Sequence, residues 1–145
     1  MRIYLACTVR GERAGVSAGR AMCTRLQEHG HEVLTTHLLA DDVDRAESAL
    51  TEARVYQRDI EWLSRCDVLV AEASGSSYGV GFEVGYIIGR AAQTHQRVLL
   101  VYQAARRQAV SRLITGNCDA ACTTFAYETV EDLVRFIDRE LGSTF

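Results

Sequence analysis

Short apolar runs alternate along the chain with longer segments in which apolar residues recur every three or four positions. A continuous apolar run predicts a buried strand, and the helical spacing predicts an amphipathic helix. The expected strands cover residues 3–8, 33–36, 67–73, 97–102 and 122–126. The expected helices cover residues 14–29, 51–65, 79–92, 107–114 and 129–141. The polar, acidic residues 38–48 are expected to form a loop or the frayed start of a helix.

Apolar strands that alternate with helices are typical of a parallel sheet with helices on both faces. Five such units in 145 residues predict a single α/β domain over residues 1–145. We expect a doubly wound, five-stranded parallel sheet with the flavodoxin-like strand order 2-1-3-4-5. In such folds ligands bind beyond the carboxyl ends of the strands, near the switch point between strands 1 and 3.

Composition narrows the classes of function. The net charge of −3 gives no reason to expect binding to nucleic acid or to a membrane surface. All 16 basic residues are arginine, which excludes Schiff-base chemistry on a lysine. Five cysteines without a Cys-x-x-Cys pair fit reduced thiols in a cytoplasmic protein. The apolar run at the N-terminus is too short for a signal peptide, and no segment approaches the length of a membrane span.

Two loops are expected at the carboxyl edge of the sheet, at residues 8–11 and 74–79. The second loop is rich in serine and glycine and leads into a helix, so its backbone N–H groups and hydroxyls predict an anion site. Arg10 in the first loop is a candidate second ligand for a phosphate. An ordinary strand-to-helix turn and a solvated surface arginine stay open as alternatives.

Two carboxylates occupy unusual positions. Glu83 lies in an apolar, glycine-rich helix start, where small neighbours allow a ligand to come close. Asp59 lies on the apolar stripe of its helix, between Val55, Tyr56, Trp62 and Leu63, whereas Arg58 is assigned to the polar face. Paired carboxylates serve glycosyl transfer. The alternatives are an acidic residue favoured by the helix dipole and an aspartate that pairs with an arginine or caps a loop.

Taken together, several stretches resemble a known family, the 2′-deoxynucleoside 5′-phosphate N-hydrolases, which are relatives of the nucleoside 2-deoxyribosyltransferases. The stretches occur in the family's order and cover nearly the whole chain. They are IYL (3–5), TVRG (8–11), TH (36–37), QRDIEWL (57–63), DVLVAE (67–72), SYGVGFEVG (77–85) and SRLI (111–114).

The resemblance implies hydrolysis of a 2′-deoxynucleoside 5′-monophosphate at its N-glycosidic bond. Glu83 matches the nucleophile that attacks the anomeric carbon and forms a covalent deoxyribosyl ester, which water then hydrolyses. Asp59 matches the family's second essential carboxylate, and Tyr4 matches a tyrosine near the nucleophile. No metal or organic cofactor is expected.

The resemblance also implies how the substrate is held. Ser77, Gly79 and Arg10 match residues around the 5′-phosphate. Ser111 matches a serine that reaches the phosphate from the neighbouring subunit, so a homodimer is expected. The residues assigned to the base and sugar side are His37, Gly11 and Leu113.

The chain departs from the family pattern in places. Glu12 replaces a glycine, Leu113 replaces a frequent methionine, and residues 38–48 have no clear match, so the preferred base stays open. A nucleoside 2-deoxyribosyltransferase is the nearest competing interpretation, but those enzymes carry an aspartate at the position of Ser77. Because a carboxylate repels a phosphate and a hydroxyl donates to it, serine favours a phosphorylated substrate. A ribonucleotide N-glycosidase and a non-catalytic nucleotide-binding module stay open as well.

Overall fold

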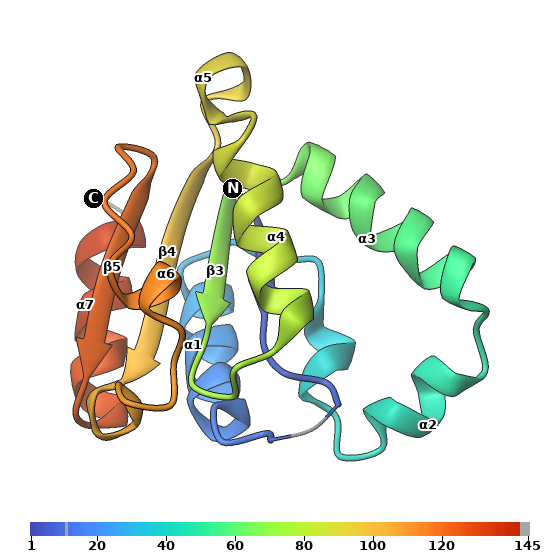
Figure 1. The fold of residues 1–145 in the computed structure, drawn as a ribbon, viewed down its shortest axis with the longest axis horizontal. Coiled ribbons are helices and arrows are strands. Elements are labelled where there is room, and N and C mark those ends of the chain that lie inside the picture. The colour runs from blue at the N-terminus through green and yellow to red at the C-terminus, as the bar shows by residue number, and fades with distance from the viewer. Residues whose placement is uncertain (11, 143–145) are drawn as a thin grey trace.

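The computed structural model describes residues 1–10 and 12–142. Strands in this part of the chain form one parallel sheet in the order β2-β1-β3-β4-β5, which confirms the predicted topology (Figure 1). The strands are β1 (Arg2–Ala6), β2 (Glu32–Val33), β3 (Val68–Glu72), β4 (Arg97–Gln103) and β5 (Cys122–Tyr127).

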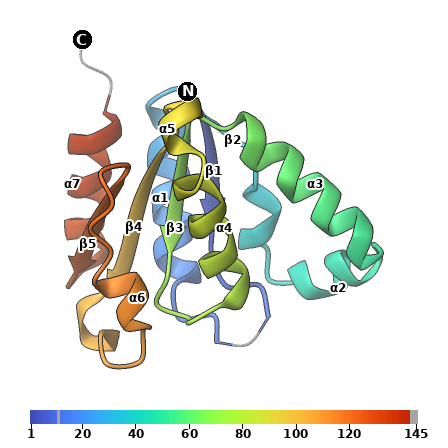
Figure 2. The ribbon, with the colours of Figure 1, turned by 45° about the horizontal axis from the view of Figure 1, so that its top comes forward.

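Helices cover both faces of the sheet. Helices α1 (Val16–Glu28) and α7 (Val130–Leu141) pack on one face, and α3 (Glu52–Arg65) and α4 (Tyr78–Ile88) lie on the other (Figures 1 and 2). Because successive side chains of a strand point to opposite faces, each strand supplies both layers. In β1, for example, Leu5 belongs to the layer under α1 and α7, whereas its fully buried neighbour Tyr4 belongs to the layer under α4.

Strand β2 is shorter than the predicted 33–36. The buried side chain of Thr35 accepts a hydrogen bond from the backbone N–H of Leu5 at 3.0 Å and donates to its carbonyl at 2.5 Å. The hydroxyl thus takes the place of ladder bonds from a longer β2. The chain then turns into a 3-10 helix, η1 (Thr36–Leu39).

The predicted helix over 107–114 is wrong. The structure has a 3-10 helix η2 (Ala104–Arg106), a turn, and a short helix α6 (Arg112–Thr115). Ser111 caps α6 by accepting from the N–H of Leu113, so the helix begins only after it. Before it, Val110 is buried in the core layer under α4, which fixes the turn in place. The predicted helix 79–92 is also divided, into α4 and a short α5 (Ala91–Thr94).

The acidic segment 38–48 contains a helix, α2 (Val43–Ser48), and a short turn connects it to α3. Val43 is fully buried in the core, which anchors the segment although its remaining residues are mostly polar. Figures 1 and 2 show α2 and the start of α3 standing away from the sheet, opposite the start of α4. This arrangement sets the walls of the site described below.

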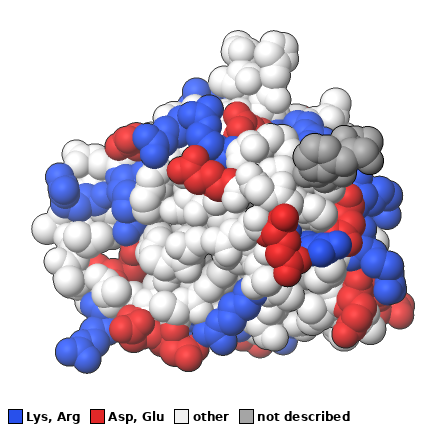
Figure 3. All heavy atoms as spheres, turned by 180° about the vertical axis from the view of Figure 1, so that it is seen from behind, with Lys and Arg blue, Asp and Glu red and all other residues white. Residues whose placement is uncertain are grey.

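Charged side chains of both signs are interspersed on the face opposite to that of Figure 1 (Figure 3). Such mixing agrees with the small net charge of the sequence. Within residues 1–10 and 12–142, the helices are too short or too polar to cross a membrane.

Candidate active site

A cavity of about 860 Å³ opens at the carboxyl edge of the sheet, a volume in the range of small-molecule sites. Its walls come from the residues after β1, from η1 and α2, and from the first half of α3. The opposite wall is the loop 75–77 with the start of α4. The cavity therefore lies where the topology predicts a ligand, next to β1 and β3.

Glu83 lines this cavity and is half-buried. Its neighbour Val84, with Val80 and Ile87, forms the buried stripe of α4, so Glu83 emerges at the border of the core. The hydroxyl of the buried Tyr4 donates to Glu83 Oε1 at 2.6 Å. Burial raises the pKa of Glu83 to about 7, with the nearby Asp59 adding to the rise and the hydrogen bond from Tyr4 opposing it. Burial and the charge of Glu83 in turn raise the pKa of Tyr4, which keeps its proton.

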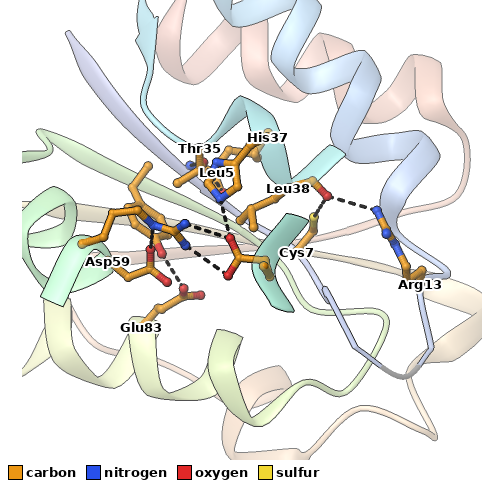
Figure 4. A network of polar contacts seen from close by, with 11 residues as sticks. Leu5, Cys7, Arg13, Thr35, His37, Leu38, Asp59 and Glu83 are labelled. Atoms are coloured by element: carbon orange, nitrogen blue, oxygen red, sulfur yellow. Dashed lines mark hydrogen bonds and ion pairs between the residues drawn. The ribbon is translucent and has the colours of Figure 1, made fainter. Parts of the chain in front are cut away.

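Asp59, on α3, lines the same cavity as Glu83, and Figure 4 shows the two carboxylates beside each other. Its Oδ1 accepts a hydrogen bond at 2.8 Å from Nε of Arg58. Asp59 is half-buried rather than part of a fully buried stripe, because its neighbour Tyr56 is exposed and Val55 is only partly covered. Asp59 therefore both pairs with an arginine, as one of the alternative interpretations expected, and lines the cavity.

The loop between β3 and α4 brings Ser77 and Gly79 to the cavity wall. Ser77 is the N-cap of α4, and its Oγ accepts from the N–H of Val80 at 3.4 Å. Among the described residues nothing accepts from the hydroxyl of Ser77 or from the backbone N–H groups of Tyr78 and Gly79, so these donors are open to an anion. Ser76 holds a left-handed φ of 51°, an arrangement that costs free energy outside glycine and asparagine.

The loops after β1 and β3 touch each other at this end of the sheet. A Cβ on Gly75 would overlap the side chain of Thr8 and the carbonyl oxygen of Glu12. Arg10 lies at the cavity wall, but its Nε binds Oδ1 of Asp44 at 2.8 Å, and both side chains are exposed. Arg10 and Ser77 both line the cavity.

Other predicted residues lie outside the cavity wall of this chain. His37 in η1 packs behind it, with Nε2 3.2 Å from Oε1 of Glu47 and its ring 5.5 Å from that of Trp62. Ser111 and Leu113 are exposed on α6 and do not line the cavity of their own chain. Gly11 lies outside the described residues.

Sequence patterns missed two residues, Glu47 and Arg58. Arg58 is not on a solvated face: its side chain is 22% exposed, and its guanidinium binds both carboxylate oxygens of Glu47 at 2.8 and 3.2 Å. Glu47 itself is 11% exposed and lines the cavity. The apolar spacing of Leu39 and Val43 was a weak signal for α2. Nothing in the local sequence indicated the ion pair between Glu47 of α2 and Arg58 of α3.

The site offers acid–base and nucleophilic chemistry. A carboxyl group with a pKa of about 7 exists in both protonation states near neutral pH, so it can attack an electrophile or exchange a proton. A second carboxylate, that of Asp59, stands beside it. Among the residues that the structure describes, no three His, Cys, Asp or Glu side chains are grouped so as to hold a metal ion.

The chain is similar in sequence to known proteins over most of its length. The sequence profile of the nucleoside 2-deoxyribosyltransferase family matches residues 3–132. A Thermofilum pendens protein with the provisional name 2′-deoxynucleoside 5′-phosphate N-hydrolase 1 is 36% identical over 97% of this chain and 95% of its own. The 5-hydroxymethyl-dUMP N-hydrolase of Danio rerio is 33% identical over 80% of this chain and 78% of its own.

Solved structures show the same fold. The CMP N-glycosidase of Clostridium botulinum superposes with a TM-score of 0.70 at 17% identity, covering 97% of this chain and all of that one. A 2-deoxyribosyltransferase of Bacillus psychrosaccharolyticus gives a TM-score of 0.55, also at 17% identity, over 92% of this chain and 90% of its own. From the profile match and the identity to its relatives, the chain belongs to the nucleoside 2-deoxyribosyltransferase family.

Proposed function

We propose that this protein hydrolyses the N-glycosidic bond of 2′-deoxynucleoside 5′-monophosphates, releasing the free base and 2-deoxyribose 5-phosphate. The observation that carries the proposal is Glu83, which lines a nucleotide-sized cavity and accepts a hydrogen bond at 2.6 Å from the hydroxyl of the buried Tyr4. Asp59 lines the same cavity, and relatives that are 33–36% identical in sequence carry the names of deoxynucleotide N-hydrolases.

The reaction proceeds in two steps. A carboxylate oxygen of Glu83 bonds to C1′ of the sugar while the bond from C1′ to the base nitrogen breaks, and the bonding electron pair leaves with the base. Asp59 supplies a proton to the leaving base or fixes the sugar, as a second carboxyl group does in retaining glycosidases. Water then attacks C1′ of the ester while the bond from C1′ to the Glu83 oxygen breaks, which frees the Glu83 carboxylate. The proton lost by the water passes to the Asp59 carboxylate or to solvent, which completes the hydrolysis.

The phosphate binds at the start of α4. The Ser77 hydroxyl and the N–H groups near Gly79 are hydrogen-bond donors at the N-terminus of α4. This helix has 11 residues, and its dipole favours a negative charge at that end. Arg10 also lines the cavity and can exchange Asp44 for the phosphate, because the ion pair of Arg10 with Asp44 is exposed and contributes little. These groups select a nucleotide over a nucleoside.

Incubation with deoxynucleoside and ribonucleoside monophosphates, followed by chromatography for free base, tests the reaction. We expect base release from deoxynucleotides, and Glu83→Ala should lower it by several orders of magnitude. Glu61→Ala is the control, because Glu61 is an exposed carboxylate on α3. Release of base only from ribonucleotides would indicate a ribonucleotide N-glycosidase. Base exchange that depends on an added acceptor base would indicate a 2-deoxyribosyltransferase. Binding of nucleotides without any turnover would indicate a non-catalytic nucleotide-binding module.

We further propose that the active form is a homodimer in which α6 of one subunit approaches the site of the other. Large apolar side chains are exposed near the cavity mouth and on α6, as expected of an uncovered interface. They are Leu50, Tyr56, Tyr78, Phe82 and Leu113. The hydroxyl of Ser111, exposed beside Leu113, would then meet the partner's phosphate site.

Subunit exchange tests the dimer. Glu83→Ala and Ser111→Ala proteins are expected to be inactive or impaired alone and to regain activity when mixed, because a mixed dimer contains one intact site. Sedimentation of the active wild-type enzyme as a strict monomer would contradict the proposal.

A further inference from the structure

We infer that Glu47 of α2 and Arg58 of α3 form a positioning pair that sets the carboxylate of Asp59. This inference rests on the proposed function, in which Asp59 acts on the base or sugar. Neither residue of the pair has a role in the reaction steps above, yet both are largely removed from solvent beside the cavity.

The guanidinium of Arg58 is held on three sides. Nη1 and Nη2 bind the two oxygens of Glu47 at 2.8 and 3.2 Å, and Nε binds Oδ1 of Asp59 at 2.8 Å. On the third side the guanidinium lies over the ring of Trp62, whose centroid is 5.0 Å from the guanidinium carbon. Such a planar fork with a bidentate partner has little freedom to rotate.

The contact between Arg58 and Asp59 is not one that the helix makes by itself. Neighbouring residues of a helix point about 100° apart and do not face each other. Arg58 must therefore bend back toward Asp59, and Glu47 together with Trp62 keeps it in that position. Without this support the terminal torsion of an aspartate is broad, so the carboxylate could turn away from the sugar.

The electrostatics favour the same function. Asp59 and Glu83 are two acidic groups at one cavity, and their repulsion contributes to the raised pKa of Glu83. Arg58 compensates the charge of Asp59 through Oδ1 and leaves Oδ2 available to the substrate. A lysine has one point charge and cannot span Glu47 and Asp59 with a fixed fork. The segment 38–48, which has no match in the family motifs, thus becomes part of the site through Glu47.

A double-mutant cycle tests the inference. Arg58→Gln is expected to lower kcat by about 10- to 100-fold with KM changed less than about threefold, since misplacement of a reacting group by about 1 Å costs about that much. In an Asp59→Asn background the same change should cost less than about threefold, because the group it positions is already gone. Glu47→Gln should give an intermediate loss, and Arg58→Lys should not restore kcat. Arg65→Gln is the control, since its ion pair with Glu61 on the same helix is exposed.

Each other outcome has a definite meaning. Equal losses from Arg58→Gln in both backgrounds, or an unchanged kcat, would overturn the inference, and melting curves identify a variant that fails to fold. A wild-type enzyme that releases no base would contradict the proposed function instead. Crystal structures of wild type and Arg58→Gln then decide the inference without activity: an Asp59 carboxylate in the same place in both overturns it, and a displaced carboxylate supports it.

Discussion

Substitution of Tyr4 by phenylalanine removes the hydroxyl 2.6 Å from Glu83 Oε1 and leaves the buried ring in place. The hydrogen bond stabilises the ionised form of Glu83, so it lowers the pKa of Glu83 against the larger effect of burial. Its loss must therefore raise that pKa. In the pH profile of base release, the acidic limb reports protonation of the nucleophile. This limb should move to higher pH in the variant.

The size of the change follows from the charged partner. A hydrogen bond to a charged group contributes roughly 1.5–3 kcal/mol, and a change of one in pKa corresponds to about 1.4 kcal/mol. Relative to a wild-type pKa of about 7, the pKa of Glu83 in Tyr4→Phe is then expected at roughly 8–9. The ionised fraction at pH 7 falls from about half to about 1–10%, so kcat/KM at pH 7 should fall about five- to fiftyfold.

The assay is kcat/KM for base release from one deoxynucleoside monophosphate between pH 5.5 and 9.5. Both proteins share the second ionisation of the substrate phosphate near pH 6, so it cancels in their ratio. We expect the ratio of wild type to variant to shrink to less than about 1.5-fold at pH 9.5, where Glu83 is mostly ionised in both. A constant ratio at all pH values would refute the reasoning, because Tyr4 would then act on structure alone. A limb that moves to lower pH would refute its sign.

Three further changes probe other parts of the site. Ser77→Asp should lower kcat/KM on deoxynucleotides at least ~10-fold but affect unphosphorylated deoxynucleosides less, since it replaces a donor by a like charge; equal losses on both substrates would separate Ser77 from the phosphate. Asp59→Asn should fold and lose about 100- to 10,000-fold in kcat, the contribution of a positioned acid; unchanged turnover with an altered melting temperature would make Asp59 structural. Gly75→Ala should destabilise the protein by about 1–3 kcal/mol in denaturant unfolding, because its Cβ overlaps Thr8 and Glu12. Gly81→Ala, whose Cβ meets nothing within 4 Å, is the control, and equal stability of the two variants would contradict the close contact of the loops.

The sequence by itself determined the architecture. Apolar runs and helical periods act locally, and a parallel sheet with helices on both faces is the arrangement that buries all of them, so the order 2-1-3-4-5 was predictable. The special position of Glu83 was also readable, because a carboxylate inside an apolar, glycine-rich helix start has no ordinary reason to be there. Helical spacing singled out Asp59 in the same way, and the family motifs added Tyr4.

Only the tertiary structure decided what surrounds those residues. Periodicity assigned Arg58 to a solvated face, since a local pattern cannot show that Glu47, eleven residues earlier, folds back to cover it. It also could not show that Thr35 bonds the backbone of Leu5 and ends β2, or that His37 lies behind the cavity wall. Each depends on side chains that meet across separate elements, and these contacts come into existence only when the elements pack.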